Sequence, residues 1–219
     1  MAFPKLATGV TAGLALTCVL TVALGARQQT MKPQTGNEMG RMADNGMGPK
    51  MTKAQKIANA LTAAPAAIGD KATVLDYPSK EGMAPEVIRP GTNGWSCFPD
   101  MPETKGNDPM CIDGPWMKWI EAYLAHKPVQ IDKVGIGYML APGGGWGSNT
   151  DPYAMKETAD NHWTHSGPHL MIVVPDTKTL AGISTDPANG GPWVMFPNTP
   201  YAHIMAPTTM ADMKHDMKH

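Results

Sequence analysis

The stretch His169-Leu170-Met171-Ile172-Val173-Val174 is the most apolar strand candidate in the chain. Two further apolar segments follow, at 193–196 and 201–205, and Pro197-Asn198-Thr199-Pro200 between them predicts a hairpin turn. A hairpin must pair with a neighbour, and segment 169–174 is its natural central partner. We therefore predict that His169 and His203 lie on adjacent antiparallel strands.

The preceding segments predict helices and strands without regular alternation. Helices are expected over residues 53–61, capped by Thr52, and over residues 115–126, with Pro115 in the first turn. Further expected elements are strands at 72–77, 86–89, 94–98 and 131–140, a loop at 147–166 and a helical turn at 177–181. The sequence thus predicts one α+β domain over residues 52–207. Its sheet is mainly antiparallel, with five to seven strands, one long helix and one or two short helices.

The first 25 residues have the pattern of a cleavable secretory signal. Lys5 precedes an apolar run that is free of charge, and Ala23 and Gly25 are spaced like a cleavage site. The alternatives are a membrane anchor, for which the run is diluted by Thr and Gly, and a lipoprotein modified at Cys18. We expect a periplasmic or secreted protein without stable membrane insertion. Its polar ends, residues 26–51 and 208–219, are expected to be disordered.

Removal of the signal leaves two cysteines, Cys97 and Cys111. An even pair in an exported protein predicts a disulfide. Closing a loop of about 15 residues would stabilise the fold by roughly 3 kcal/mol. The alternative is a pair of reactive or metal-binding thiols.

Charge and motifs exclude several classes of function. The chain carries 18 basic and 19 acidic residues, which does not favour nucleic acid as a partner. It lacks the G-x-S-x-G, H-E-x-x-H, Walker and C-x-x-C patterns. We therefore expect the partner to be a metal ion or a small molecule.

The C-terminal tail is rich in soft metal ligands. Its candidate ligands are Met210, Met213, His215, Met217 and His219. Thioethers suit Cu(I), and imidazole adds affinity for Cu(II). The tail, and more weakly the segment around Met39, Met42 and Met47, resembles the Met/His-rich stretches of periplasmic copper-resistance and copper-chaperone proteins, without their long M-x-x-M arrays. The resemblance implies copper binding; the alternative is a solvated tail of biased composition.

Four histidines in the predicted domain give a second metal candidate. His162, His165 and His169 are spaced by three and four residues, and His203 lies on the closing strand. Together with an acid such as Asp151, two or three neutral imidazoles would form a zinc or copper site. The alternative for His169 and His203 is a core histidine bonded to the backbone or to Asp151. We expect His162 and His165 to be surface loop residues.

Three functions remain open at this level. The leading hypothesis is an exported protein with one disulfide that binds copper or another transition metal. Its role would be metal handling or metal tolerance. The second is a periplasmic hydrolase-type enzyme that uses His169, His203 and Asp151 as acid, base or metal ligands. The third is a small-molecule binding module lined by Trp95, Trp146, Trp163 and Trp193.

Several short segments resemble those of a group of exported bacterial proteins of unknown activity. They are Gly91-Thr92-Asn93-Gly94-Trp95-Ser96-Cys97, Asn107-Asp108-Pro109-Met110-Cys111, Ser148-Asn149-Thr150-Asp151-Pro152, Gly167-Pro168-His169, Gly190-Gly191-Pro192-Trp193-Val194-Met195 and Pro200-Tyr201-Ala202-His203-Ile204-Met205. The resemblance spans most of residues 55–207. It implies export and one domain, and it assigns no catalytic residue.

Overall fold

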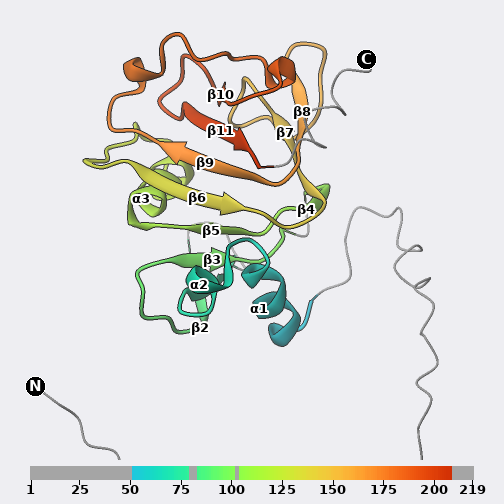
Figure 1. Cartoon of the computed structure of the whole chain (residues 1–219), viewed down its shortest axis with the longest axis vertical. Coiled ribbons are helices and arrows are strands. Elements are labelled where there is room, and N and C mark those ends of the chain that lie inside the picture. Colours follow the sequence, from blue (N-terminus) through green and yellow to red (C-terminus); the bar gives the residue numbers. More distant parts are fainter. Residues whose placement is uncertain (1–50, 79–82, 102–103, 209–219) are drawn as a thin grey trace, which may run out of the picture. The chain divides into compact units, whose positions relative to one another are not determined.

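The computed structural model describes residues 51–78, 83–101 and 104–208. Its main feature is an eight-stranded mixed sheet. The strand order is β10-β11-β9-β6-β5-β3-β1-β2, and Figure 1 shows the strands stacked in that order. All described pairs are antiparallel except β1 with β3. The strands are β1 (Thr73–Asp76), β2 (Glu86–Arg89), β3 (Ser96–Phe98), β5 (Met110–Ile112), β6 (Gly135–Met139), β9 (His169–Val173), β10 (Trp193–Met195) and β11 (His203–Pro207).

A second, three-stranded sheet has the order β4-β7-β8. Its strands are β4 (Gly106–Asn107), β7 (Gly144–Ser148) and β8 (Trp163–Ser166). The prediction of a loop throughout 147–166 was therefore wrong at both ends. Glycine explains the pairing, because a Cβ at Gly144 would lie only 1.9 Å from the backbone oxygen of Ser166. A glycine-rich run, which predicts a turn, can thus also form a strand that requires close backbone approach.

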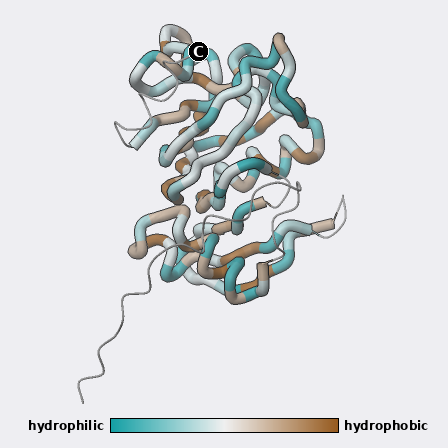
Figure 2. Tube along the Cα trace, turned by 90° about the vertical axis from the view of Figure 1, so that its right-hand side faces the viewer, coloured by the Kyte–Doolittle hydropathy of each residue, from teal (hydrophilic) through white to brown (hydrophobic). Residues whose placement is uncertain are grey.

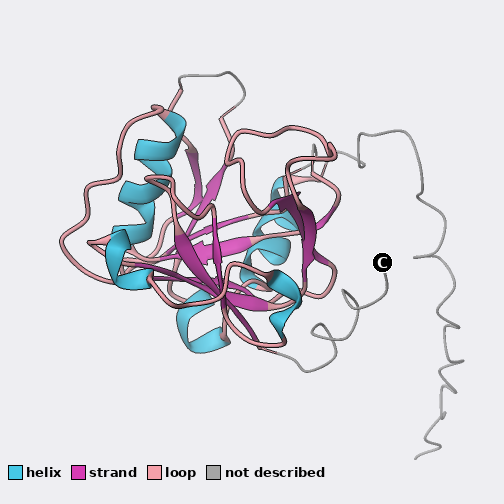
Figure 3. Cartoon of the chain, turned by 90° about the horizontal axis from the view of Figure 1, so that it is seen from above, coloured by secondary structure: helices cyan, strands magenta, loops and turns pink. Residues whose placement is uncertain are grey.

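The helices begin where the sequence signals them. Helix α1 (Lys53–Leu61) has a capping box between Thr52 and Gln55, and α3 (Gly114–Leu124) is capped by the Asp113 side chain. The shorter elements are α2 (Ala66–Gly69) and the 3-10 helices η1 (Thr177–Leu180) and η2 (Pro187–Asn189). Figure 3 shows helices on more than one side of the strands.

The two faces of the large sheet are covered by different elements. Consecutive residues of a strand point to opposite faces, so Cys111 packs in the cluster beneath α1 and Ile112 packs in the cluster beneath α3. The α3 cluster also contains Trp116 and Met171. At the β10–β11 end, a third cluster around Leu180 covers the face opposite α3. Figure 2 shows hydrophobic (brown) and hydrophilic (teal) segments alternating along the described trace.

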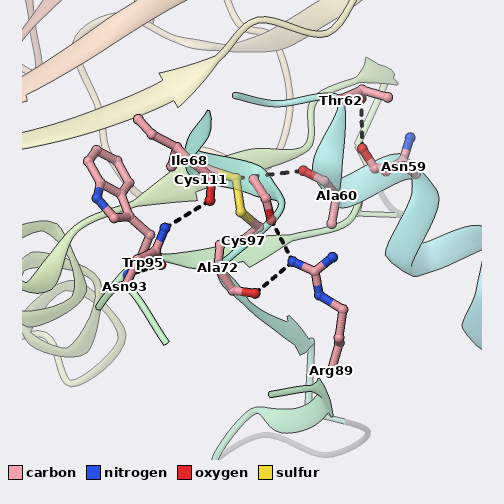
Figure 4. Close-up of a disulfide and its surroundings, with 11 residues drawn as sticks. Asn59, Ala60, Thr62, Ile68, Ala72, Arg89, Asn93, Trp95, Cys97 and Cys111 are labelled. Carbon is pink, nitrogen blue, oxygen red and sulfur yellow. Dashed lines mark hydrogen bonds between the residues drawn. A yellow bond between two sulfur atoms is a disulfide. The ribbon is translucent and has the colours of Figure 1, made fainter. Parts of the chain in front are cut away.

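The predicted disulfide is present. Cys97 and Cys111 are directly opposite each other on β3 and β5, with their Cα atoms 4.0 Å apart. This separation is shorter than the about 5.5 Å expected for an average disulfide. Figure 4 shows the bond beneath α1, with the Cys111 sulfur 3.7 Å from the carbonyl oxygen of Ala60.

The α+β class, the antiparallel character of the sheet and the disulfide were predicted correctly. The strand count was not: eleven strands occur among the described residues, against the expected five to seven. Short strands account for the difference. For example, β4 lies between the two cysteines, and the three-residue strand β5 contains Cys111 itself.

Candidate functional site

His169 and His203 lie on adjacent strands, as predicted. Strand β9 pairs with β11 antiparallel, and His169 is opposite Pro207. His203 is four positions from Pro207, so the alternation of a strand places it on the same face as His169. Both side chains are buried. The face they share is the one that α3 covers, since it also carries Met171.

The two imidazoles are nevertheless not a directly opposed pair. The register offsets them by four positions, or about 13 Å along the strands. The residues that do oppose each other between them are Met171 on β9 and Met205 on β11. The expectation that the two rings face one another across the ladder is corrected accordingly: they flank a methionine pair. The sequence pattern fixes which face a residue occupies but not which residue lies across from it.

Both histidines are held by the same local contact. The Nδ1–H of His169 donates to the carbonyl oxygen of Gly167 at 2.5 Å, and that of His203 donates to the carbonyl of Tyr201 at 2.9 Å. A carbonyl can only accept, so Nδ1 carries the proton in each neutral ring and Nε2 carries the lone pair. Backbone anchoring of one ring nitrogen is typical of histidines that ligate metals through the other.

His203 is enclosed by aromatic rings. Trp116 and Trp119 from α3 and Phe196 after β10 approach it edge-on, with centroid distances of 5.1, 5.4 and 5.5 Å. Burial lowers the pKa of His203 to about 4; the bond to Tyr201 opposes this shift, and a positive charge on His169 adds a smaller lowering. His203 is therefore a neutral imidazole at physiological pH.

Asp151 does not join the histidines. It is exposed on the loop after β7, where its Oδ1 accepts from the backbone of Tyr153 at 2.9 Å. It lines a cavity of about 470 Å³ together with loop residues such as Lys156 and Asp160. Among residues 51–78, 83–101 and 104–208, no group of three or more His, Cys, Asp or Glu side chains could hold a metal ion. The expected set of two histidines with this acid is therefore not assembled.

The other candidates in the domain are dispersed. His162 is exposed, as expected, but His165 lies on β8, half-buried, with Nε2 bonded to the carbonyl of Gly143 at 2.8 Å and its ring against Trp146. Of the four tryptophans, Trp193 is buried and donates to Asn149. Trp95 packs on Tyr138. Neither of the two cavities described for this structure is lined by any of the four.

The sequence analysis did not single out Met171 and Met205, which lie between the two histidines on β9 and β11. Each follows a buried histidine at the second position, as His169-Leu170-Met171 and His203-Ile204-Met205. The repeated His-x-Met pattern was the available signal, because period-two spacing places both residues on one face of a strand. Methionine within an apolar run is usually core packing, and this expectation obscured the repeat.

The remaining predicted features lie outside the described residues. These are the signal at 1–25, the Met-containing segment at 26–50, and the tail ligands Met210, Met213, His215, Met217 and His219. Within the described ranges, no helix has the length and apolar character needed to cross a membrane. Comparison with protein families, curated proteins and solved structures finds no match.

Proposed function

We propose that this is an exported protein that binds a transition metal, with His169 and His203 as ligands. The observation that carries the proposal is a pair of buried histidines on one face of adjacent strands, each oriented by a backbone carbonyl through Nδ1. In His203 that contact leaves the Nε2 lone pair as the donor that a metal would take.

Burial and neutrality support this role. Metal binding requires an imidazole without a proton on the ligating nitrogen, so protons compete with the metal. His203 has a pKa of about 4, which removes that competition at neutral pH. The indole rings of Trp116 and Trp119 also keep water from its ring. A dry surrounding shell is one of the features by which proteins tune bound metals.

The Met/His tail has a separate part in this proposal. It would supply a low-affinity binding segment that collects the metal before the domain takes it. Thioethers carry no proton and resist the oxidising conditions outside the cytoplasm better than thiolates do. A tail that collects the metal and a domain that retains it would suit a protein that handles metal or confers tolerance to it.

The test is metal analysis of the exported protein. The purified protein is loaded with copper or zinc, desalted, and measured for metal per chain by mass spectrometry. We expect His169→Asn with His203→Asn to lose the retained metal, because Asn keeps a donor near the Nδ1 position and removes Nε2. Replacing the five tail ligands by Leu and Asn should lower only the weakly held fraction.

His165→Asn is the matched control. His165 has its Nε2 engaged by a backbone carbonyl, and its loss should leave the retained metal unchanged. Equal retention by the wild type and a folded His169/His203 double variant would refute the proposal.

A further inference from the structure

Trp119 is the one buried tryptophan whose indole N–H has no acceptor in the described part of the chain. The other two buried tryptophans donate from Nε1: Trp116 to the carbonyl of Met171 at 3.1 Å, and Trp193 to the side chain of Asn149 at 3.0 Å. Trp119 is only 7% exposed, yet its Nε1 makes no hydrogen bond. A buried indole N–H usually finds an acceptor, so this donor points to a group that the protein does not supply.

The Trp119 ring is fixed by the aromatic side chains around it. It stacks on Tyr123, with a centroid distance of 5.4 Å and an interplanar angle of 9°. Tyr201 and His203 pack at nearly right angles to it, at 78° and 83°. Turning the ring toward another acceptor would break these contacts. The donor is therefore oriented before any ligand arrives, which lowers the cost of binding.

Trp119 also lines a cavity of about 140 Å³ at the edge of the α3 cluster. An apolar cavity of about 150 Å³ can hold benzene, so this one has room for a molecule of about six non-hydrogen atoms. Apolar walls with a few fixed polar groups are typical of small-molecule sites. Here the walls are mainly aliphatic, formed by Val129, Val173, Val174, Pro175, Pro200 and Ala202.

The charge at the cavity determines which kind of acceptor it can receive. Among the described residues that line it, Asp176 is the only charged side chain. Asp176 is exposed, and its Oδ1 accepts from the backbone of Lys178 at 3.0 Å at the start of η1. A carboxylate or phosphate ligand would meet this negative charge, with no lining cation to offset the loss of its own hydration. The acceptor is therefore a neutral oxygen.

We propose that this cavity binds a small neutral carbonyl compound, such as a short-chain ketone, amide or ester, whose oxygen accepts from the Trp119 Nε1–H. The aliphatic walls cover the hydrocarbon part of the ligand and remove it from water. This inference goes beyond the proposed metal binding and does not depend on it, because neither His169 nor His203 lines the cavity.

The test follows the indole N–H of Trp119 by NMR in the isotope-labelled, metal-free full chain. The six tryptophans give six indole signals, and Trp119→Phe identifies the relevant one by its loss. Cyclopentanone is the probe, because it suits the cavity in size and carries one neutral oxygen. We expect a saturable downfield shift of the Trp119 signal, with a Kd on the order of 1 mM. Methylenecyclopentane has the same shape without the oxygen and should leave the signal nearly unshifted.

Two variants separate the hydrogen-bond donor from the cavity, and the backbone amide signals of Thr177 and Ala202 report binding in both. Trp119→Phe keeps an aromatic ring and removes the N–H. It should weaken cyclopentanone binding at least about fivefold, with a smaller effect on methylenecyclopentane. Val129→Phe keeps the indole and fills the cavity, so it should abolish binding of both probes.

Matched controls make the same substitutions away from the cavity. Trp95→Phe changes a tryptophan that does not line it, and Val134→Phe changes a valine that is 53% exposed. Both should bind cyclopentanone as the parent does. Thermal unfolding of each variant confirms that it is folded.

Three results would overturn the inference. If cyclopentanone gives no saturable shift of the Trp119 signal, a fixed water or the protein itself satisfies the N–H. Binding that persists in folded Val129→Phe, or that Trp119→Phe weakens equally for both probes, contradicts the site or the role of its donor. Tighter binding of butyrate, a carboxylate of similar size, contradicts the neutral ligand class. Loss of metal retention in the histidine test leaves this inference unaffected, and the reverse also holds.

Discussion

The pH dependence of stability offers a test of the burial of His203 that needs no metal. Its pKa is about 4 in the folded protein, against an ordinary value of 6.5. Between these values the unfolded chain binds more protons than the native one. The stability contributed by the neutral ring is therefore complete above pH 6.5 and is lost as pH falls toward 4. The loss amounts to about 3 kcal/mol, at roughly 1.4 kcal/mol per pKa unit.

A second, half-buried group changes the stability in the opposite direction. Burial, and then the neighbouring carboxyl of Asp100, raises the pKa of Asp108 from 3.8 to about 7. Here the native state binds more protons, so this contribution is complete below pH 3.8 and is lost as pH rises to 7. Its size is at most about 4 kcal/mol, because the two carboxyls share their titration. In the wild type the two effects largely cancel between pH 4 and 6.5.

The substitutions separate the two effects. In Asp108→Asn the amide cannot ionise, so the unfolding free energy should rise with pH from 4 to 6.5 by about 3 kcal/mol, the His203 effect alone. Adding His203→Asn should remove this increase of the unfolding free energy with pH, even if the substitution lowers the unfolding free energy at every pH. Urea denaturation at half-unit pH steps measures both slopes, with the exposed Asp132→Asn as control. A profile of Asp108→Asn that stays flat, or that is unchanged by the His203 substitution, would show that His203 is not a neutral buried ring.

Three further predictions concern the scaffold. Reduction of the Cys97–Cys111 bond should lower the unfolding free energy by about 3 kcal/mol, seen in thermal melts with and without reductant, while metal retention is unchanged. Gly144→Ala should destabilise the fold by more than about 2 kcal/mol in urea, because φ is +59° and the Cβ would collide with the backbone of β8. Gly147→Ala should cost far less, because its Cβ would meet only the Met195 Cε at 3.9 Å, an ordinary contact. Asn149→Ala should cost about 2–3 kcal/mol in the same assay, since this buried amide bonds both an indole of β10 and a distant carbonyl; a cost below about 0.5 kcal/mol would contradict that role.

Local signals in the sequence were sufficient where local chemistry decides the structure. The Thr52 cap, the Asp113-Gly114-Pro115 start and the apolar run at 169–173 all marked real boundaries to within a residue or two. The Pro197–Pro200 turn likewise joins β10 to β11 as expected. These features depend on residues close in sequence, for which propensity and capping are informative.

Such local signals do not identify which strands pair when the strands are distant in the sequence. Nothing near Gly144 in the sequence reveals that Ser166 will lie against it, and a glycine-rich run by itself favours a turn. The candidate site depends on one register in the same way. A shift of one residue between β9 and β11 would move His203 to the opposite face relative to His169, and a shift of two would separate Met171 from Met205. The sequence therefore identified the histidines but not their partners.

The disulfide determines whether the two cysteine sulfurs are available as metal ligands. In the described part of the chain both cysteines are joined to each other, and Cys111 faces the α1 side of the sheet. The His-x-Met residues lie on the α3 side, on strands separated from β5 by β6. Exported proteins lose free thiols to disulfides, whereas thioethers remain available as soft ligands. The Met171–Met205 pair and the disulfide therefore lie on opposite faces of the same sheet, and the disulfide constrains the β3–β5 pair rather than the β9–β11 pair.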